Sequence, residues 1–329
     1  MKTTQFGRRS AVIGILAAAA TSLAIAQANT AGSYPAKIIK MVVPYSPGSG
    51  TDILARLVSE RLSQRLGQPI VVENRPGASG QIGTAAVAAA APDGYTMMLA
   101  PPTHIVNSVL RKVPYDPIKN FDPIIQIARA NLVLVTNAAT PVNNLKELVS
   151  YLKAQGDNAT YSSAGQASTL HLYTAQLQQV LGTNMRHVPS KGVPGAIMDV
   201  VQNSVTVLLA PMESAVPQIK NGRLKAIAQT GKSRFAQIPD VPTFAEAGLP
   251  SVNSELWYGL FVPAGTPKPI VERLNKEVAA VLSMTEVKTQ LAAAGAEPVG
   301  GSPEQLAALC REELALWTDV VKRNGIKED

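Results

Sequence analysis

Hydrophobic and polar positions from residue 38 to residue 100 alternate between two periods. The apolar run IIKMVV is typical of a strand buried on both faces, and TDILARLVSERLSQRLG follows with apolar residues at helical spacing and ends on Gly67. Two more apolar runs, PIVVEN and YTMMLA, flank the small-residue segment SGQIGTAAVAAAAPDG. The order strand, helix, strand, helix, strand predicts a parallel sheet with helices on both faces.

The pattern restarts after FDPIIQIARANLVLVTN, a segment with two apolar runs close together. Strand-like runs then alternate with helix-like stretches, of which one has an asparagine cap and another ends on Gly182. The strands are MRHVP, SVTVLLA and LKAIAQT, and the helices are NNLKELVSYLKAQG, LHLYTAQLQQVLG and PGAIMDVVQ. SELWYGLFVP reads as a further strand, and the remaining tail is helical. The sequence therefore predicts a second α/β unit.

No flexible linker separates the two units, which predicts two lobes packed face to face. We expect the chain to cross between them near residues 131 and 252. Lobe 1 would then comprise residues 29–131 plus 253–329, and lobe 2 residues 132–252. Ligands of open α/β sheets bind outside the carboxyl ends of the strands, so the two lobes would share a ligand cleft between them.

Residues 1–28 are predicted to be a secretory signal peptide that is removed on export. MKTTQFGRRS carries three basic residues and no acid, and AVIGILAAAATSLAIA is an apolar run that leads to an A-x-A site at residues 24–26 or 26–28. An N-terminal membrane anchor is the alternative, although the run is short for a bilayer span. Export would place the mature protein in the periplasm.

The charge pattern argues against a nucleic-acid partner. Loss of the leader lowers the formal net charge from +7 to +4, and the remaining basic residues alternate with acids on helix faces. A mild positive field would still attract an anion. Cys310 is the only cysteine, so no disulfide can form within the chain, and its helical context predicts a core position.

Motifs for cofactors and metals are incomplete. Gly48-Ser49-Gly50 begins a dinucleotide fingerprint but Ile53 occupies its third glycine position, and Gly231-Lys232-Ser233 lacks the first glycine of a phosphate loop. The three histidines have no metal-ligand spacing. We expect no cofactor and no metal. A Ser-His-Asp set could assemble in space, so an exported hydrolase stays an alternative.

Four loops that each precede a helix are rich in glycine, serine and alanine: residues 46–52, 77–80, 162–168 and 189–192. Small residues let a backbone approach a ligand closely, and helix N-termini offer free N–H groups with a partial positive charge. Together they would hold a carboxylate without an arginine, although each loop alone could be an ordinary cap. Asp52 is expected to brace its own loop, His171 either to approach the ligand or to be structural, and Tyr45 either to cover the cleft or to pack.

Five stretches carry a family resemblance across essentially the whole mature chain: YPAKIIKMVVPYSPGSGTDILAR, VVENRPGASGQIGTAAVAAAAPDGYT, YSSAGQASTLHL, IPDVPTFAEAGLP and WYGLFVPAGTPKPIVERLNKEV. In this order they resemble the Bug family, the extracytoplasmic solute receptors of tripartite tricarboxylate transporters. The resemblance implies a periplasmic binding protein of type II fold. Such a protein has no catalytic activity, closes two lobes on a small organic carboxylate and delivers it to a membrane permease. We expect a monomer.

The resemblance also implies which residues bind the ligand. Carried over to this chain, they are Tyr45, Ser46, Gly48, Ser49, Asp52, Ala78, Ser79, Ser162, Ser163, Ala164, Gly165 and Ser168, with His171 close behind. Three positions depart from the family pattern: Ser49 replaces a glycine, Ser190 replaces a tyrosine and Ala210 stands where an acid is frequent. Loss of the tyrosine would widen the pocket, and loss of the acid would remove a partner for a ligand amine. The hypothesis is a non-amino carboxylate with a bulky or aromatic body. A sensor subunit that uses the same closure is a further alternative.

Overall fold

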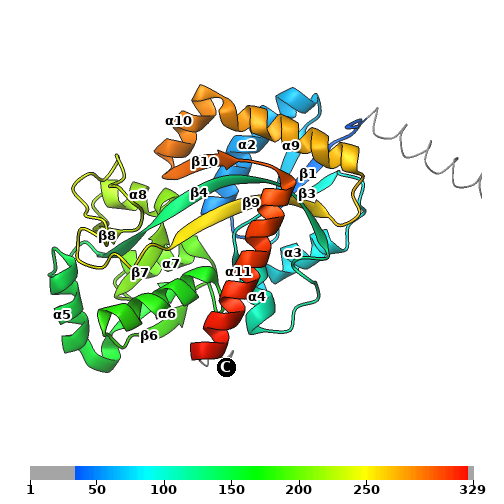
Figure 1. The fold of residues 1–329 in the computed structure, drawn as a ribbon. Coiled ribbons are helices and arrows are strands. Elements are labelled where there is room, and N and C mark those ends of the chain that lie inside the picture. The colour runs from blue at the N-terminus through cyan, green and yellow to red at the C-terminus, as the bar shows by residue number, and fades with distance from the viewer. Residues whose placement is uncertain (1–33, 325–329) are drawn as a thin grey trace, which may run out of the picture.

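The computed structural model describes residues 34–324 and shows an α/β protein of two lobes (Figure 1). The predicted signal peptide lies outside the described residues. Each lobe is built around its own part of one curved sheet, and the strand order across the whole sheet is β2-β1-β3-β9-β4-β7-β5-β6. No helix within residues 34–324 has the length and apolar character needed to cross a bilayer.

The first lobe contains a mixed sheet. Strands β1 (Ile39–Val43), β2 (Ile70–Asn74) and β3 (Thr96–Ala100) are parallel, as the sequence predicts. Strand β9 (Glu255–Pro263) joins β3 in the antiparallel sense, and β10 (Ala296–Gly300) pairs with β4 (Phe121–Asn137). The helices of this lobe are α2 (Gly50–Leu66), α3 (Gln81–Ala88) after the short turn η1 (Ala78–Gly80), α4 (Thr103–Leu110), α9 (Lys268–Ser283) and α10 (Thr285–Ala293).

The second lobe repeats the plan with shorter strands. Strand β5 (Thr160–Ser163) is parallel to β6 (Arg186–Pro189) and to β7 (Val207–Pro211), while β8 (Leu224–Gln229) pairs with β4. The helices are α5 (Leu145–Gln155), followed by the turn η2 (Gly156–Asn158), then α6 (Thr169–Leu181), α7 (Val193–Val201) and α8 (Met212–Lys220).

Strand β4 connects the lobes. The sequence shows two apolar runs here, but the structure joins them into one strand of 17 residues. Its first part, to Asn131, pairs with β9, and its second part, from Leu132, pairs with β7 and β8. The exchange of partners inside one strand makes β4 a continuous connection between the lobes, and the division into lobes at residues 131 and 252 stays a prediction.

Local signals at the helix ends are confirmed. The side chain of Asn144 accepts a hydrogen bond from the Glu147 amide at 2.9 Å and caps α5. Gly67 and Gly182 adopt the left-handed conformation after α2 and α6. Elements with weak signals were not predicted: α4 follows two prolines, α8 contains Pro217, β5 is polar, and β10 contains Pro298.

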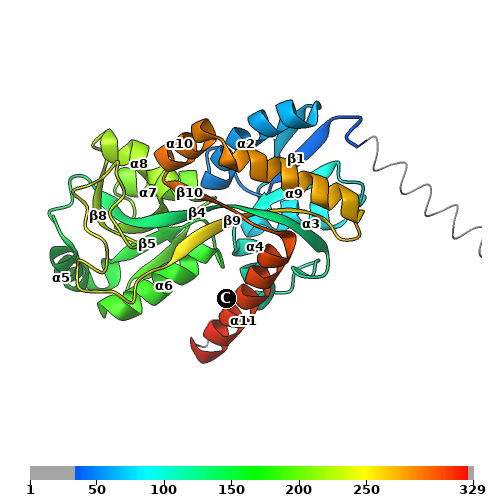
Figure 2. The ribbon, with the colours of Figure 1, turned by 45° about the horizontal axis from the view of Figure 1, so that its top comes forward.

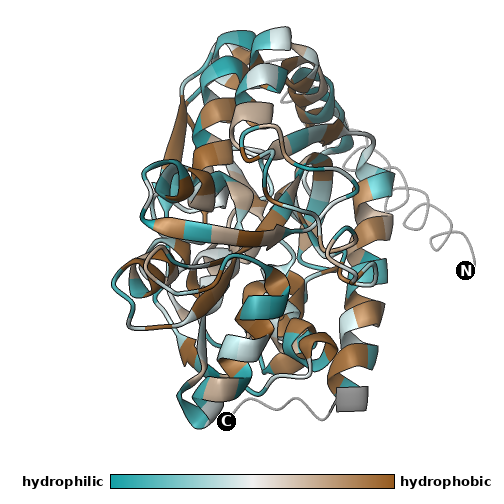
Figure 3. Ribbon diagram, turned by 90° about the vertical axis from the view of Figure 1, so that its left-hand side faces the viewer, coloured by the Kyte–Doolittle hydropathy of each residue, from teal (hydrophilic) through white to brown (hydrophobic). Residues whose placement is uncertain are grey.

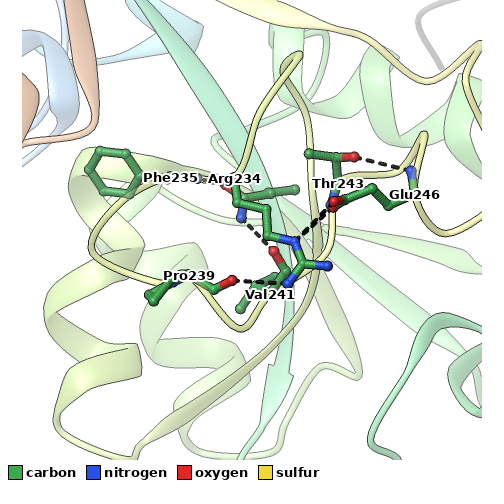
Figure 4. A network of polar contacts seen from close by, with 7 residues as sticks. Arg234, Phe235, Pro239, Val241, Thr243 and Glu246 are labelled. Atoms are coloured by element: carbon green, nitrogen blue, oxygen red, sulfur yellow. Dashed lines mark hydrogen bonds and ion pairs between the residues drawn. The ribbon is translucent and has the colours of Figure 1, made fainter.

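A long loop between β8 and β9 is held by polar contacts around Arg234 (Figure 4). Arg234 Nε donates to both carboxylate oxygens of Glu246, at 3.1 and 2.9 Å, and its Nη1 donates to the Pro239 carbonyl oxygen at 3.1 Å. The Gln229 side chain donates to the Val241 carbonyl and accepts from the Phe235 amide. These bonds satisfy backbone groups that would otherwise need the hydrogen bonds of a helix or sheet, so the loop needs no regular structure.

The last helix, α11 (Pro303–Asn324), runs from the first lobe towards α6 of the second (Figures 1 and 2). It packs against β4 and α4, and Cys310 lies in its buried face, as predicted. Burial raises the pKa of the Cys310 thiol to about 12. Further along, the Trp317 ring packs against Tyr173 of α6 with 5.4 Å between ring centroids. Figure 3 shows hydrophobic and hydrophilic segments interleaved along the helices, as expected where one face meets a core.

Replacement of Trp317 by alanine should lower the free energy of unfolding by roughly 3–5 kcal/mol, because a large aromatic side chain is lost from a packed site. Trp317 is 1% exposed, whereas its neighbour Leu316 is 52% exposed, so Leu316→Ala is the matched control and should change stability by less than about 0.5 kcal/mol. Urea unfolding followed by circular dichroism measures both. Equal stabilities of the two variants would contradict the packing role of α11.

Candidate ligand-binding site

Two adjacent cavities lie between the lobes. The inner cavity has a volume of about 40 Å³ and the outer one about 550 Å³. Both are lined by residues of the two lobes, and they share Tyr45, Ser79, Ala164 and Gly192. The inner volume is enough for a few water molecules or a group the size of a carboxylate. The predicted cleft is therefore a small inner chamber with a larger outer chamber beside it.

Five helices begin at the wall of the inner cavity. The residues at or beside these starts that line it are Gly50 and Thr51 of α2, Thr103 of α4, Thr169 and Leu170 of α6, Val193 of α7, and Pro211 before α8. The amides of Gly50, Thr51, Thr103, Leu170 and Val193 have no hydrogen-bond partner within residues 34–324. First-turn amides carry partial positive charge, so the chamber is suited to an anionic group.

The walls of both cavities contain a single charged side chain among the described residues. It belongs to Lys191, which lines the outer cavity, and no aspartate or glutamate lines either one. No cluster of potential metal ligands occurs in the part of the chain that the structure describes. The electrostatics of the site therefore come from backbone dipoles and hydroxyl groups.

The loop before α2 confirms the bracing role expected of Asp52. Its carboxylate accepts hydrogen bonds from the Gly48 amide at 2.9 Å, Asn74 Nδ2 at 3.0 Å and Arg56 Nε at 3.1 Å. Burial alone would raise its pKa, but these bonds from Arg56, Gly48 and Asn74 together lower it. Asp52 and Gly48 thus use their polar groups on each other and line neither cavity, whereas Ser49 caps α2 and lines the inner one.

Tyr45 and the turn at Ala78 and Ser79 form the first-lobe wall. Ala78 and Ser79 have φ angles of 47° and 53°, which non-glycine residues rarely adopt, and both line the outer cavity. A Cβ atom on Gly80 would lie 3.0 Å from the Tyr45 ring, so the turn packs directly against it. The Tyr45 hydroxyl is buried without a hydrogen-bond partner of its own among the described residues. Burial raises its pKa. Tyr45 both lines the two cavities and packs against the core, so the structure does not separate the two roles expected of it.

The loop from Ser162 to Ser168 divides its residues between bracing and lining. Ser162 Oγ bonds to the Val188 carbonyl and to Asp199, both at 3.2 Å, and lines neither cavity. Ser163 Oγ lies 2.7 Å from His187 Nε2 and donates to the Gly165 carbonyl at 2.9 Å, also away from the cavities. Ala164 lines both cavities, Gly165 the outer and Ser168 the inner one. The hydroxyls of Ser162 and Ser163 thus brace the loop in this form, and the ligand contacts that the resemblance implies for them stay a prediction.

His171 is structural. Its ring stacks on His187 with centroids 3.8 Å apart, and its Nδ1 accepts a hydrogen bond from the Ala167 amide at 3.2 Å. Burial lowers the pKa of His171 to about 4, and burial together with the charge of His171 lowers that of His187 to about 3. Both rings are therefore neutral at physiological pH. The pair lines neither cavity and holds the loop that does.

Of the remaining predicted positions, two line a cavity and one does not. Ser46 and Ser190 line the outer cavity. Ala210 is fully buried in β7, where it pairs with Val133, and lines neither cavity. Its neighbour Pro211 takes the lining position. An acid does come near this wall three residues later, at Glu213, which sequence reasoning about Ala210 alone did not anticipate.

Hydrogen bonds between the lobes show that this is a closed form. Ser79 Oγ donates to the Gln166 carbonyl at 2.7 Å, and Ser46 Oγ donates to the Lys191 carbonyl at 3.3 Å. The hydroxyls of Thr103 and Thr169 lie 2.8 Å apart. These contacts bring α4 and α6 together above the inner cavity and account for its small volume.

Sequence reasoning missed part of the wall. Thr103 and Tyr258 line the inner cavity, and Lys191 lines the outer one. Thr103 begins a helix just beyond the carboxyl end of β3, and that topological rule alone could have indicated it. Tyr258 lies within β9, a strand with almost no polar residues, and carried no comparable signal.

The model of the family described as the tripartite tricarboxylate transporter family receptor matches residues 54–326. The chain belongs to this receptor family. Protein BugT of Bordetella pertussis is 35% identical to it over 97% of this chain and 98% of that protein. The structure of periplasmic binding protein BugD is 33% identical, with a TM-score of 0.85 over 90% of this chain and 100% of that one. R. palustris Rpa4515 with adipate is 34% identical, with a TM-score of 0.86 over 89% and 99%.

The receptor is a binding protein and not an enzyme, as its family and structural neighbours are. The Ser163–His187 pair is the one part of a hydrolase site that the structure assembles among the described residues, and it faces away from both cavities. The hydrolase alternative is thereby overturned. The two-lobed periplasmic binding protein fold and the Bug resemblance are confirmed.

Replacement of Asp52 by asparagine should destabilise the receptor by about 1–3 kcal/mol, because three donors lose a charged acceptor. The pKa of this carboxyl is lower in the folded protein than its ordinary value of 3.8, so its contribution is fully present above that value and is lost as the pH falls through the lowered pKa. The difference between wild type and Asp52→Asn should therefore be constant near neutral pH and shrink below about pH 4. Urea unfolding at several pH values measures it. The exposed Asp157→Asn is the control, and a similar loss in that variant would contradict the brace.

Proposed function

We propose that the receptor captures a non-amino organic carboxylate and delivers it to the membrane permease of a tripartite transporter. The observation that supports this most directly is the convergence of five helix starts, four of them with unbonded amides, on one small chamber. Such a chamber binds a carboxylate through N–H groups and hydroxyls, with no need for an arginine.

The proportions of the two cavities suggest how a ligand lies. One carboxylate would occupy the inner chamber of about 40 Å³, and the body of the molecule would extend into the outer chamber of about 550 Å³. Tyr45 stands at the junction of both and offers an aromatic face. This arrangement favours an elongated or flat acid over a compact one.

The charged side chains in the cavity walls limit the class of ligand further. A ligand ammonium group would need an anionic partner, and no aspartate or glutamate among the described residues lines either cavity. Lys191 lines the outer chamber, where it would meet a second carboxylate. The adipate in the structure of the similar R. palustris protein is a dicarboxylate of this kind. We therefore favour aliphatic or aromatic dicarboxylates, with aromatic monocarboxylates next.

The proposed cellular location follows from the receptor family and from the predicted signal peptide. Residues 1–28 are proposed to direct export, and the mature receptor is proposed to work as a periplasmic monomer that presents its closed form to a permease. Closure of two lobes about a hinge changes the surface that a membrane partner meets. A sensor partner could use the same change, but no observation on this chain favours it.

A thermal-shift screen tests the ligand class. The panel holds adipate, C4 dicarboxylates, tricarboxylates, aromatic mono- and dicarboxylates and amino acids, each added to the mature protein. A ligand at 100 times its dissociation constant adds about 2.7 kcal/mol and should raise the melting temperature visibly. We expect shifts with dicarboxylates and none with amino acids. Shifts with amino acids alone would contradict the non-amino class, and silence across the panel would contradict carboxylate binding.

Thr51→Val should then weaken the best ligand by about 2- to 12-fold, because one hydroxyl hydrogen bond of about 0.5–1.5 kcal/mol is lost while shape is kept. Thr51 lines the inner cavity, and its hydroxyl has no hydrogen-bond partner among the described residues. Titration calorimetry gives the affinity. Thr289→Val, on the exposed face of α10, is the control and should bind as the wild type does. An unchanged affinity in Thr51→Val would show that the carboxylate does not lie in the inner chamber.

A further inference from the structure

A carboxyl group is buried behind the inner cavity and crosses from one lobe to the other. Glu213 lies in the first turn of α8, in the second lobe, and is 4% exposed. Its Oε1 accepts a hydrogen bond from the hydroxyl of Tyr258, which lies on β9 of the first lobe and lines the inner cavity. Its Oε2 is buried and has no hydrogen-bond partner among the described residues. An unpartnered carboxylate oxygen in such a place is costly unless the group carries a proton.

Two glycines of the first lobe make room for this approach. A Cβ atom on Gly50, at the start of α2, would overlap the Glu213 carboxyl. A Cβ atom on Gly295, in the turn before β10, would overlap the side chain of Met212. The start of α8 therefore enters the first lobe between α2 and this turn.

No cation neutralises Glu213 within residues 34–324. Tyr258 is the titratable group that bonds to it from β9, and Tyr45 lies beyond Tyr258. On α2, the carboxylate of Asp52 is bonded to Arg56 and Asn74. On α8 itself, Lys220 donates to Gln237 of the long loop. The turn at Ala294 and Gly295 offers no charged side chain. Burial accordingly raises the pKa of Glu213, offset in part by the hydrogen bond from Tyr258, to about 7.

We propose that Glu213 is a positioning residue whose neutral, protonated form favours closure of the lobes, so that closing on a carboxylate in mildly acidic solution takes up a proton at this side chain. The part that concerns the ligand rests on the proposed function, and the part that concerns closure does not. In the open form Glu213 would be hydrated and would ionise as an ordinary glutamate. In the closed form an ionised Glu213 beside Gly50 would lose its hydration and repel a ligand carboxylate at the same helix end.

Protonation of Glu213 and closure of the lobes are thermodynamically linked. The closed form holds the proton more tightly, so closure is favoured at low pH and weakens as the pH rises from the ordinary value of 4.5 to about 7. Above that range Glu213 is ionised in both forms and the effect is constant. A pKa difference of this size corresponds to a change of up to about 300-fold in the closure equilibrium, and ligand affinity should change by as much.

Titration calorimetry with adipate between pH 5.5 and 8.5, in buffers of different ionisation enthalpy, tests the ligand part. Below about pH 7 the wild type should bind with uptake of a proton and with an affinity that falls as the pH rises, and above it both should level off, whereas Glu213→Gln should bind without uptake and with a flatter profile. Titration of the ligand itself affects both proteins alike, so their ratio isolates Glu213. Tyr258→Phe removes a bond that favours the ionised form, so the fall in affinity should move to higher pH. If these residues had a purely structural role, the pH at which the affinity falls would not change.

Small-angle scattering of the ligand-free mature protein at pH 5.5 and 8.5 tests closure without any ligand. The wild type should be more compact at pH 5.5, and Glu213→Gln should be unchanged by pH. If adipate fails to bind but this difference is seen, the ligand class is wrong and the role of Glu213 stands. If adipate binds with the same proton uptake and pH profile in Glu213→Gln as in the wild type, the role of Glu213 is overturned and the ligand class stands. No pH effect in either experiment overturns the role as well.

Discussion

The unbonded amides at the starts of four helices, α2, α4, α6 and α7, are the constraint on which the rest of the site depends. A helix end whose N–H groups face a closed chamber is unfavourable unless something accepts those bonds. The chain tolerates the arrangement because the walls there are small residues and hydroxyls, and because both lobes contribute. A single lobe would expose its amides to water. Only closure removes them from water, and only an anion then satisfies several of them at once. Binding of an anion and closure of the lobes therefore favour each other.

Several hydrogen-bonded side chains near the site do not line it. Asp52 holds the loop before α2, and the Ser163–His187 pair holds the loop before α6. In this form their polar groups bond to neighbours within the protein. What they supply is a fixed backbone, with amides that already point into the chamber. Preorganised amides bind an anion without the entropy cost of ordering long charged side chains. A site of this kind has few charged side chains in its lining and still attracts an anion.

Much of this could be predicted from the sequence, and the failures have physical causes. Periodicity placed the parallel strands of the first lobe and most helices, and caps such as Asn144 and Gly182 fixed their ends. Small-residue loops before helices correctly indicated segments that line the two cavities. Individual roles were harder, since a serine in such a loop either lines the cavity or bonds to a neighbour. Ser168 and Ser163 share one loop, and only the position of His187, 19 residues beyond Ser168, decides between the two roles. Long-range partners of this kind leave no local pattern.

The same limit explains Glu213. The alanine at position 210 suggested a wall without an acid, and the lining does lack one among the described residues. The acid stands one helical turn further on, behind the wall, in a space that exists because position 50 is glycine. Any side chain at position 50 would exclude it, and a solvated Glu213 would be an ordinary carboxylate with no bearing on binding. Two residues 163 positions apart therefore decide together whether a negative charge near the ligand is permitted. Because burial favours the protonated acid, the receptor can place a carboxyl beside a carboxylate-binding chamber without placing a charge there.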